Sequence, residues 1–334
     1  MSKWKIILSL AVILLFFGVG SILGYSAYLT NKAVQVTEQS QMELARGETS
    51  EKRQTSINPD IDNTSILFVG IDSSNKRNPE GEVSSRSDSL ILATFNNEDH
   101  SVKMLNIPRD SYVYIPEVGY KDKITHAHAF GGMDAAVSTV ENMLDIPVDY
   151  YVRLDFNSFV DVVNALGGIR YDVPFHIEEQ NSQDNKNSIV LEEGSQKLNG
   201  EEALALARTR KYDSDLARGN RQMDLLEAIV QKASQTGSIG SYGDVIDSLG
   251  KHLKTNLSFD QLVTFKDYVL SQDHFQFDTM QLKGEAMTLD GIWYYSVDEQ
   301  SLKHSADELK QHLGIDTPLD DENTANSTEK ENSL

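Results

Sequence analysis

Several short apolar runs in the chain have the length of buried strands. Ile66–Ile71 is continuously apolar and is followed by Asp72, as expected of a strand that is buried on both faces. Leu90–Phe95 and Val102–Ile107 predict two more strands, separated by a polar turn. Further strands are predicted at Tyr150–Leu154 and Ile169–Val173 and near residues 275–282 and 292–297.

Between these strands, apolar side chains recur at helical spacing. Met133–Leu144 and Phe156–Leu166 are amphipathic, and the second segment is stopped by a pair of glycines. Helices are also predicted around residues 200–209, 215–235 and 259–270. Because strands and helices alternate, the sequence predicts an α/β fold, namely an α-β-α sandwich with a central mixed (parallel and antiparallel) sheet.

The N-terminal region contains a much longer apolar run. No charged residue occurs between Lys5 and Lys32, and a helix over residues 6–29 would be about 36 Å long, enough to cross a bilayer core of about 30 Å. Lysines precede the run in a very short tail, so the positive-inside rule places the N-terminus in the cytoplasm and the rest outside. A cleaved signal peptide is the alternative, although its apolar region is usually shorter.

The chain therefore divides into five parts. We expect a cytoplasmic tail (1–5), a single-pass transmembrane signal anchor (6–30) and a polar extracellular linker (31–61). A catalytic domain (62–310) and a disordered acidic tail (311–334) follow.

Composition excludes several classes of protein. The chain has 30 basic and 51 acidic residues among 334, a net charge of −21, which argues against nucleic acid as a partner. It contains no cysteine, so disulfide scaffolds, thiolate metal sites and cysteine nucleophiles are excluded.

One segment is basic despite this acidic background. Arg208, Arg210, Lys211, Arg218 and Arg221 outnumber the two acidic residues between them. If a helix starts near Asp215, then Asp215, Arg218 and Gln222 share one face that continues as an apolar face. Arginines on such a face need anionic partners. A solvated basic loop paired with Asp213 and Asp215 is the competing interpretation.

Acidic residues follow or precede two of the predicted strands. Asp72 ends one strand and Asp88 precedes the next, and two carboxylates together with phosphate oxygens are a usual way to hold Mg²⁺. Arg109 follows a third strand and could bind a phosphate through two of its guanidinium nitrogens. Each residue taken alone could equally be an ordinary turn residue or part of a surface ion pair.

Taken in order, these motifs resemble the LytR-CpsA-Psr family of Gram-positive cell-wall proteins. The resemblance extends from about Ser65 to Ser296. Its motifs are Phe68-Val69-Gly70-Ile71-Asp72, Arg86-Ser87-Asp88-Ser89, Ile107-Pro108-Arg109-Asp110, Lys123-Ile124-Thr125-His126-Ala127, Asn164-Ala165-Leu166-Gly167-Gly168-Ile169 and Ala207-Arg208-Thr209-Arg210 with Asp215, Arg218, Arg221 and Gln222.

The resemblance implies a membrane-anchored phosphotransferase for cell-wall biogenesis. Such an enzyme attaches an anionic glycopolymer, such as teichoic acid or capsule, from a polyprenyl-pyrophosphate carrier to peptidoglycan through a phosphodiester. Carried over, Asp72 and Asp88 would hold Mg²⁺ (or Mn²⁺), and Arg109, Asp215, Arg218 and Asp88 would be catalytic. The pyrophosphate would be bound by Arg86, Arg109, Arg208, Arg210, Arg218, Arg221 and Gln222.

The family would also require an apolar tunnel for the lipid, and the helix 156–166 is its expected wall, through Phe156, Phe159, Val160 and Val163. Two other functions stay open at this point. One is a polyprenyl-pyrophosphate-sugar hydrolase with water as acceptor, and the other is a non-catalytic lipid-binding regulator.

Overall fold

The computed structural model describes residues 28–71, 85–209, 211, 214–235, 246, 253–265 and 276–315. Within these ranges, no helix is both long and apolar enough to cross a bilayer. The predicted anchor (6–30) lies almost entirely before residue 28, and the acidic tail lies mostly after residue 315, so both predictions fall outside the described residues.

A six-stranded mixed sheet forms the centre of the fold, in the order β11-β6-β1-β2-β3-β12. β1 is parallel to β6 and β3 is parallel to β12, whereas β1–β2, β2–β3 and β6–β11 are antiparallel. The predicted α/β class with a mixed sheet is therefore confirmed. The strands are β1 (Thr64–Ile71), β2 (Ser87–Asn96), β3 (Ser101–Asn106), β6 (Tyr150–Asp155), β11 (Lys254–Thr255) and β12 (Gln276–Gln281).

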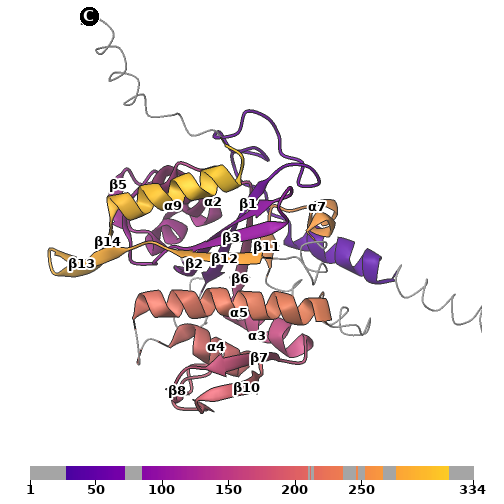
Figure 1. The fold of residues 1–334 in the computed structure, drawn as a ribbon, viewed down its shortest axis with the longest axis vertical. Helices are drawn as coiled ribbons and strands as arrows, with labels where there is room; N and C mark the ends of the chain where they lie inside the picture. Colours follow the sequence, from indigo (N-terminus) through magenta and orange to yellow (C-terminus); the bar gives the residue numbers. More distant parts are fainter. Residues whose placement is uncertain are drawn as a thin grey trace, which may run out of the picture.

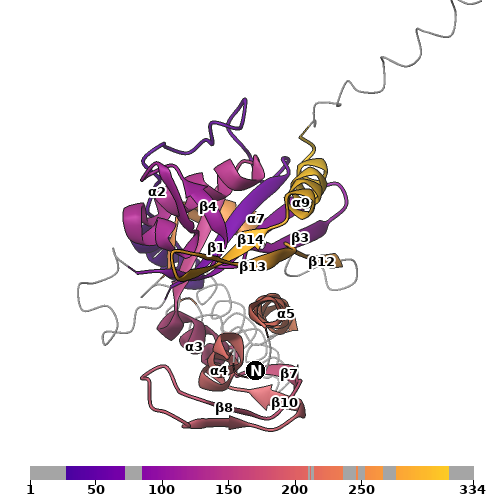
Figure 2. The same ribbon diagram turned by 90° about the vertical axis from the view of Figure 1, so that its left-hand side faces the viewer.

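Helices cover both faces of this sheet (Figures 1 and 2). Alternate residues of each strand point to opposite faces, so Leu67 and Leu92 enter the larger core beneath α2 and α9, whereas Ile91 and Met104 pack beneath α5. The helices are α2 (Thr125–Leu144), α3 (Phe156–Ala165), α4 (Gly200–Arg208), α5 (Asp215–Gln235), α7 (Phe259–Thr264) and α9 (Glu299–His312).

A smaller unit lies beyond α3 and α4 on the α5 side of the sheet (Figure 2). It is built on the two-stranded sheet of β7 (Ile169–Val173) and β10 (Gly194–Leu198), with the hairpin of β8 (Ile177–Glu179) and β9 (Ile189–Leu191) nearby. Val163, Ile169 and Leu206 belong to its separate core. The helices α3 and α4 lie between this unit and the sheet (Figure 2).

The sequence missed the short hairpins and α9. One hairpin pairs β4 (Tyr112–Ile115) with β5 (Tyr120–Lys123), and another pairs β13 (Gly284–Leu289) with β14 (Ile292–Val297). Of these four strands, only β14 was predicted. β5 carries four polar or aromatic residues and no buried one, so it shows no apolar alternation. Its pairing with β4 depends on neighbouring elements rather than on its own pattern.

Residues 41–63, expected to be part of a linker, contact the folded domain along most of their length. Leu44 is buried in the main core, and Met42 donates a backbone hydrogen bond to Thr255. Arg46 forms an ion pair with Glu141 at 2.5 Å, and Arg53 forms one with Asp149 at 2.6 Å. The segment has no apolar period because it attaches through single side chains instead of a continuous face.

We expect Arg53→Ala to destabilise the protein strongly. Asp149 is buried and accepts two hydrogen bonds from Arg53 and one from the backbone of Ser65. Removing the guanidinium would leave a buried carboxylate without its cation, at a cost of about 3 kcal/mol in the free energy of unfolding. Lys52→Ala is the matched control, because the Lys52–Asp145 pair is exposed and contributes about 0.5 kcal/mol. Denaturant unfolding measures both, and equal losses would contradict a buried role for Arg53.

His312, the last residue of α9, joins that helix to β2 and β3. Its Nδ1 lies 2.8 Å from the hydroxyl of Thr94, and its Nε2 lies 2.9 Å from the hydroxyl of Ser101. Burial lowers the pKa of His312 to about 4. The neutral imidazole, which donates from one nitrogen and accepts at the other, is therefore the form that stabilises the fold.

This histidine predicts an acid sensitivity of stability. An unfolded chain would bind the proton near pH 6.5, whereas the folded one binds it near pH 4, so the contribution is complete above pH 6.5 and is lost as pH falls toward 4. Urea unfolding at pH 7.5, 5.5 and 4.5 should show a steeper decline for the native protein than for His312→Gln. Parallel declines would show that other groups account for the acid sensitivity.

Candidate active site: a cavity with one charged and one apolar end

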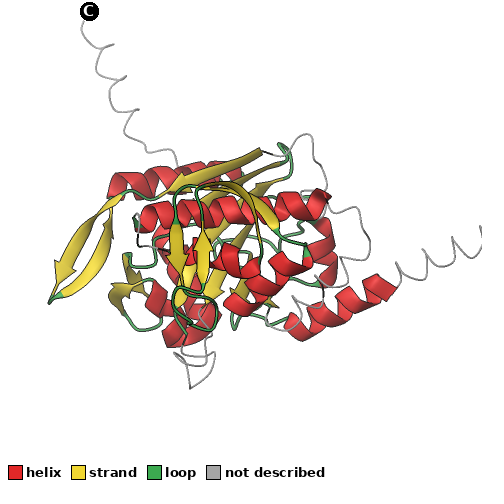
Figure 3. Ribbon diagram, turned by 90° about the horizontal axis from the view of Figure 1, so that it is seen from below, coloured by secondary structure: helices red, strands yellow, loops and turns green. Residues whose placement is uncertain are grey.

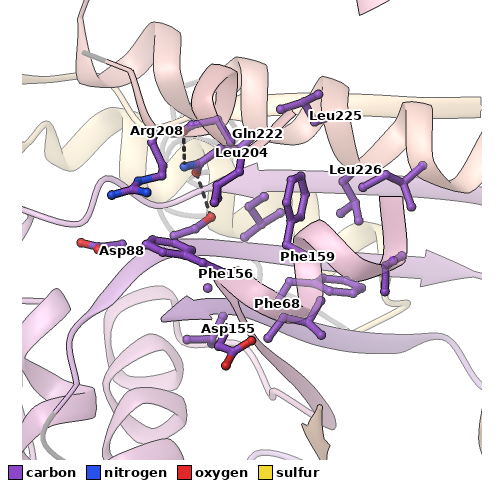
Figure 4. A pocket seen from close by; sticks show the side chains of 18 of the residues that line it. Phe68, Asp88, Asp155, Phe156, Phe159, Leu204, Arg208, Gln222, Leu225 and Leu226 are labelled. Atoms are coloured by element: carbon purple, nitrogen blue, oxygen red, sulfur yellow. Dashed lines mark hydrogen bonds between the residues drawn. The ribbon is translucent and has the colours of Figure 1, made fainter. Parts of the chain in front are cut away.

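A cavity of about 690 Å³ lies between the sheet and the helices α3, α4 and α5 (Figure 4). Its lining is divided by chemistry. Charged and polar side chains gather at one end, where strands and helix termini meet, and apolar side chains line the remainder. The polar and charged lining residues are Asp88, Ser89, Arg109, Asp155, Glu179, Gln180, Arg208, Lys211, Arg218 and Gln222.

Three separate elements bring the lining arginines together. Arg109 follows β3, Arg208 ends α4, and Arg218 lies in the first turn of α5. Gly219 allows α5 to approach the sheet, because a Cβ there would lie 2.0 Å from the side-chain nitrogen of Asn106 in β3. Arg109 is about a hundred residues from the other two arginines in the sequence, and all three line one cavity.

The charged end carries internal ion pairs. Arg109 binds the carboxylate of Asp88 through Nη1, and its Nε lies 3.5 Å from Asp110. Asp110 also pairs with Lys123 at 2.8 Å. These alternating charges reduce repulsion among the cations and hold Arg109 at the cavity.

Gln222 of α5 contacts β2 and α4, and Arg208 of α4 packs against Phe156, the first residue of α3. The Gln222 amide accepts a hydrogen bond from Ser89 at 2.8 Å and donates one to the Ala207 carbonyl at 3.1 Å, which joins β2, α4 and α5 (Figure 4). The Arg208 guanidinium lies 4.8 Å from the ring centroid of Phe156. Stacking on that ring limits the conformations of Arg208 before any ligand binds.

The apolar end is formed mainly by α3 and α5. Phe156 and Phe159 line it as predicted, but Val160 and Val163 do not, and Val162 takes their place. Val163 packs instead into the core of the smaller unit. Helical periodicity predicts the correct face, but which residue at its edge reaches the cavity depends on where β7 and β10 lie. The apolar lining includes Phe68, Ile91, Val152, Leu154, Phe156, Phe159, Val162, Leu166, Leu204, Leu225, Leu226 and Ile229.

The sequence model of the LytR_cpsA_psr family matches residues 27–311. The chain belongs to the LytR-CpsA-Psr family. The resemblance seen in the sequence motifs is confirmed.

Several relatives of this LytR-CpsA-Psr protein have a named function or a solved structure. The polyisoprenyl-teichoic acid–peptidoglycan teichoic acid transferase TagT of Bacillus subtilis is 42% identical over 316 residues, covering 94% of this chain and 96% of TagT. A structure described as TagT bound to LIIa-WTA has a TM-score of 0.71 at 42% identity, covering 82% of this chain and 100% of that one. Another, YwtF (TagT) with bound octaprenyl pyrophosphate lipid, has a TM-score of 0.67 at 39% identity, with the same coverages of 82% and 100%.

Arg221 has a different position from the one expected of a pyrophosphate-binding residue in this LytR-CpsA-Psr protein. It does not line the cavity. Its guanidinium is buried and donates hydrogen bonds to the carbonyls of Leu206 at 3.2 Å and Thr209 at 2.7 Å. Arg221 therefore satisfies carbonyls at the C-terminal end of α4. Its helical position, three residues after Arg218, already places it about 60° away from the cavity-facing direction.

The other predicted site residues fall into two groups. Arg86 is exposed just before β2 and does not line the cavity. Asp72, Arg210 and the side chain of Asp215 lie outside the described residues. Sequence reasoning also missed Asp155, Glu179 and Gln180, whose short polar motifs gave no distinct signal. Lys211 was recognised as part of the basic segment but was not assigned to the site.

Carboxylates at the cavity could take part in holding a metal ion. Asp88 lies at the charged end, and Asp155 is buried and caps α3 through Ser158. Ile71, the last residue of β1, is paired with Ser87, next to Asp88. Among the described residues, no group of three or more His, Asp or Glu side chains is arranged to hold a metal. Asp88 with phosphate oxygens fits the hard oxygen ligands that Mg²⁺ prefers.

Because Arg208 lines the cavity and Arg221 does not, we expect Arg208→Ala to reduce ligand affinity and Arg221→Ala to reduce stability. Arg208→Ala should weaken binding of inorganic pyrophosphate about tenfold or more, because one charge-assisted contact is lost. Arg221→Ala should instead lower the free energy of unfolding by about 2 kcal/mol, since two buried carbonyls lose their donor. Calorimetric titration and denaturant unfolding distinguish the two, with exposed Arg170 as the control. An affinity loss for Arg221→Ala with unchanged stability would contradict its assignment.

Proposed function

We propose that this protein transfers an anionic glycopolymer from a polyprenyl-pyrophosphate carrier to a hydroxyl group of peptidoglycan. The observation that carries the proposal is the division of the cavity. A cationic end next to a long apolar interior is complementary to a diphosphate attached to a polyprenyl chain, and to few other metabolites. The naming of TagT as a teichoic acid transferase supports the same reaction class.

The described arginines would bind the diphosphate. Arg109, Arg208 and Arg218 converge from different elements, and bidentate guanidinium contacts match phosphate oxygens in geometry and charge. Gln222 would add amide hydrogen bonds while it maintains the contact between β2 and α4. Phe159, Leu226 and their neighbours would surround the first isoprene units (Figure 4).

The reaction itself requires mainly positioning and neutralisation of charge. The acceptor oxygen attacks the phosphorus that bears the glycopolymer, its P–O bond forms, and the bond to the polyprenyl-phosphate oxygen breaks. The hydroxyl proton is released to a base, and the polyprenyl phosphate leaves with the electron pair. Guanidinium groups fixed around the diphosphate stabilise the negative charge that accumulates on that leaving group.

Magnesium is proposed as the cofactor, held by Asp88 together with Asp72, as the family resemblance implies. Bound there, it would neutralise charge on the phosphate oxygens. We further propose that residues 6–30 anchor the protein in the cell membrane, with the catalytic domain outside, where peptidoglycan is found.

Reconstituted transfer tests the function. Full-length protein in vesicles would receive a polyprenyl-pyrophosphoryl glycopolymer, Mg²⁺ and purified glycan strands, and mass spectrometry would detect the coupled product. Arg109→Ala should reduce the rate by a hundredfold or more, about 3 kcal/mol, whereas Arg170→Ala on the exposed face of β7 should leave it unchanged.

Two outcomes would overturn this proposal. Release of free phosphosugar without coupled glycan would indicate a hydrolase. Undiminished transfer by Arg109→Ala would show that the cavity is not the reaction site. The metal proposal is tested separately: EDTA should abolish turnover and Mg²⁺ or Mn²⁺ should restore it, and full activity in EDTA would contradict it.

A further inference from the structure

Two hairpins beside the charged end of the cavity carry an unusual number of aromatic side chains. Tyr114 is 42% exposed on β4, and Trp293 is 43% exposed on β14. Tyr112 is paired with Lys123 and Tyr114 with Lys121 across the β4–β5 ladder, so these four side chains share one face. We call this the aromatic–lysine surface, made of Tyr112, Tyr114, Lys121, Lys123 and Trp293, and the buried ring of Tyr294 packs against Tyr112.

The rings of Tyr112, Trp293 and Tyr294 contact one another or the lysines. Tyr112 and Tyr294 pack edge to face with centroids 4.8 Å apart. The ammonium of Lys123 lies 5.7 Å from the ring centroid of Trp293 and 5.6 Å from that of Tyr294. Such contacts reduce the side-chain entropy that a ligand would otherwise have to remove on binding.

The surface is continuous with the charged end of the cavity. Lys123 pairs with Asp110, which also contacts Arg109, and Arg109 lines the cavity. The second hairpin is attached at the same place, because Tyr295 donates a backbone hydrogen bond to Asp110 at 2.8 Å. A ligand on the aromatic–lysine surface could therefore extend directly to the bound diphosphate.

The orientation of the cavity indicates what would approach from this side. The hairpin β13–β14 projects from the end of the sheet where β12 ends (Figure 1). At that end, the side chain of Gln281 in β12 donates a hydrogen bond to the carbonyl of Leu216 at the start of α5. The apolar lining continues along α5 to Ile229 and Ala233, away from that end. The helical residues 28–40 lie at the opposite end of the molecule from the hairpin (Figures 1 and 3).

In-line phosphoryl transfer requires the acceptor and the leaving group to lie on opposite sides of the phosphorus. The leaving polyprenyl phosphate would occupy the cavity toward Ile229, so the acceptor must come from the hairpin side. We infer that the aromatic–lysine surface binds the glycan strand of peptidoglycan that supplies the acceptor hydroxyl. This inference rests on the proposed function.

Sugar rings fit this surface better than the alternatives do. Exposed aromatic faces offer flat apolar area to the C–H faces of pyranose rings, while the hydroxyls stay hydrated. A polyanion would require several cations available to it, yet Lys123 is already paired with Asp110. A membrane would be expected near residues 28–40, not at the opposite end of the molecule.

Steady-state kinetics of the full-length protein test the inference. Trp293→Ala and Tyr114→Ala should each raise the KM for purified, uncrosslinked glycan strands about tenfold, with the KM for the lipid-linked donor unchanged. Val190→Ala, which removes a 53% exposed apolar side chain from the β8–β9 hairpin, should change neither value. If Trp293→Ala lowers the melting temperature, its KM also reflects lost stability, and the acceptor KM of Tyr114→Ala then tests the inference.

The contrary outcomes differ from a failure of the proposed function. If the wild-type protein couples polymer to glycan and both variants keep its acceptor KM, the inference is wrong and the transferase stands. A rise in the donor KM alone would assign the surface to the glycopolymer, and reduced vesicle binding alone would assign it to the membrane; either would overturn the inference. Absence of coupling by the wild type would refute the proposed function itself.

Discussion

Several guanidinium groups at one end of a cavity repel one another, and the structure depends on the groups that offset this repulsion. Arg109 is held between Asp88 and Asp110, and Arg208 lies over Phe156 within 3.6 Å of the Asp184 carboxylate. Asp88 and Asp184 lie far from their arginines in the sequence, whereas Asp110 follows Arg109 in the same turn. The folding of β2, β3, α4 and α5 against one another is therefore what makes a concentrated cationic site possible in a chain of net charge −21.

The same packing gives the cavity a direction. α5 contributes Arg218 and Gln222 near its start and Leu225, Leu226 and Ile229 further along one face, so a single helix spans both kinds of lining. α3 opposes it with Phe156 and Phe159. Because the charged end adjoins the aromatic hairpins and the apolar end points away from them, donor and acceptor have separate approaches. A transferase needs that separation more than a hydrolase does, since water can enter from any side.

Residues outside the sheet also contribute to the stability of this arrangement. Residues 41–63 attach to Glu141 and Asp149 through two buried ion pairs, and Leu44 enters the main core. A polar segment before the domain is thus part of the fold. It also connects the helical residues 28–40 to the sheet, because Gln41 and Met42 pair with Thr255 of β11.

The sequence by itself determined five of the six strands of the sheet, the amphipathic helices other than α9 and the face of α5 that carries Arg218 and Gln222. Hydrophobic periodicity makes this possible because it records which side of an element is buried. It could not show that Arg221 is bonded to carbonyls of α4, that Val162 and not Val163 reaches the cavity, or that two polar hairpins lie side by side. Those outcomes depend on contacts between residues far apart in the chain. Only the tertiary structure decides them, because a local pattern specifies the direction of a side chain but not what lies opposite it.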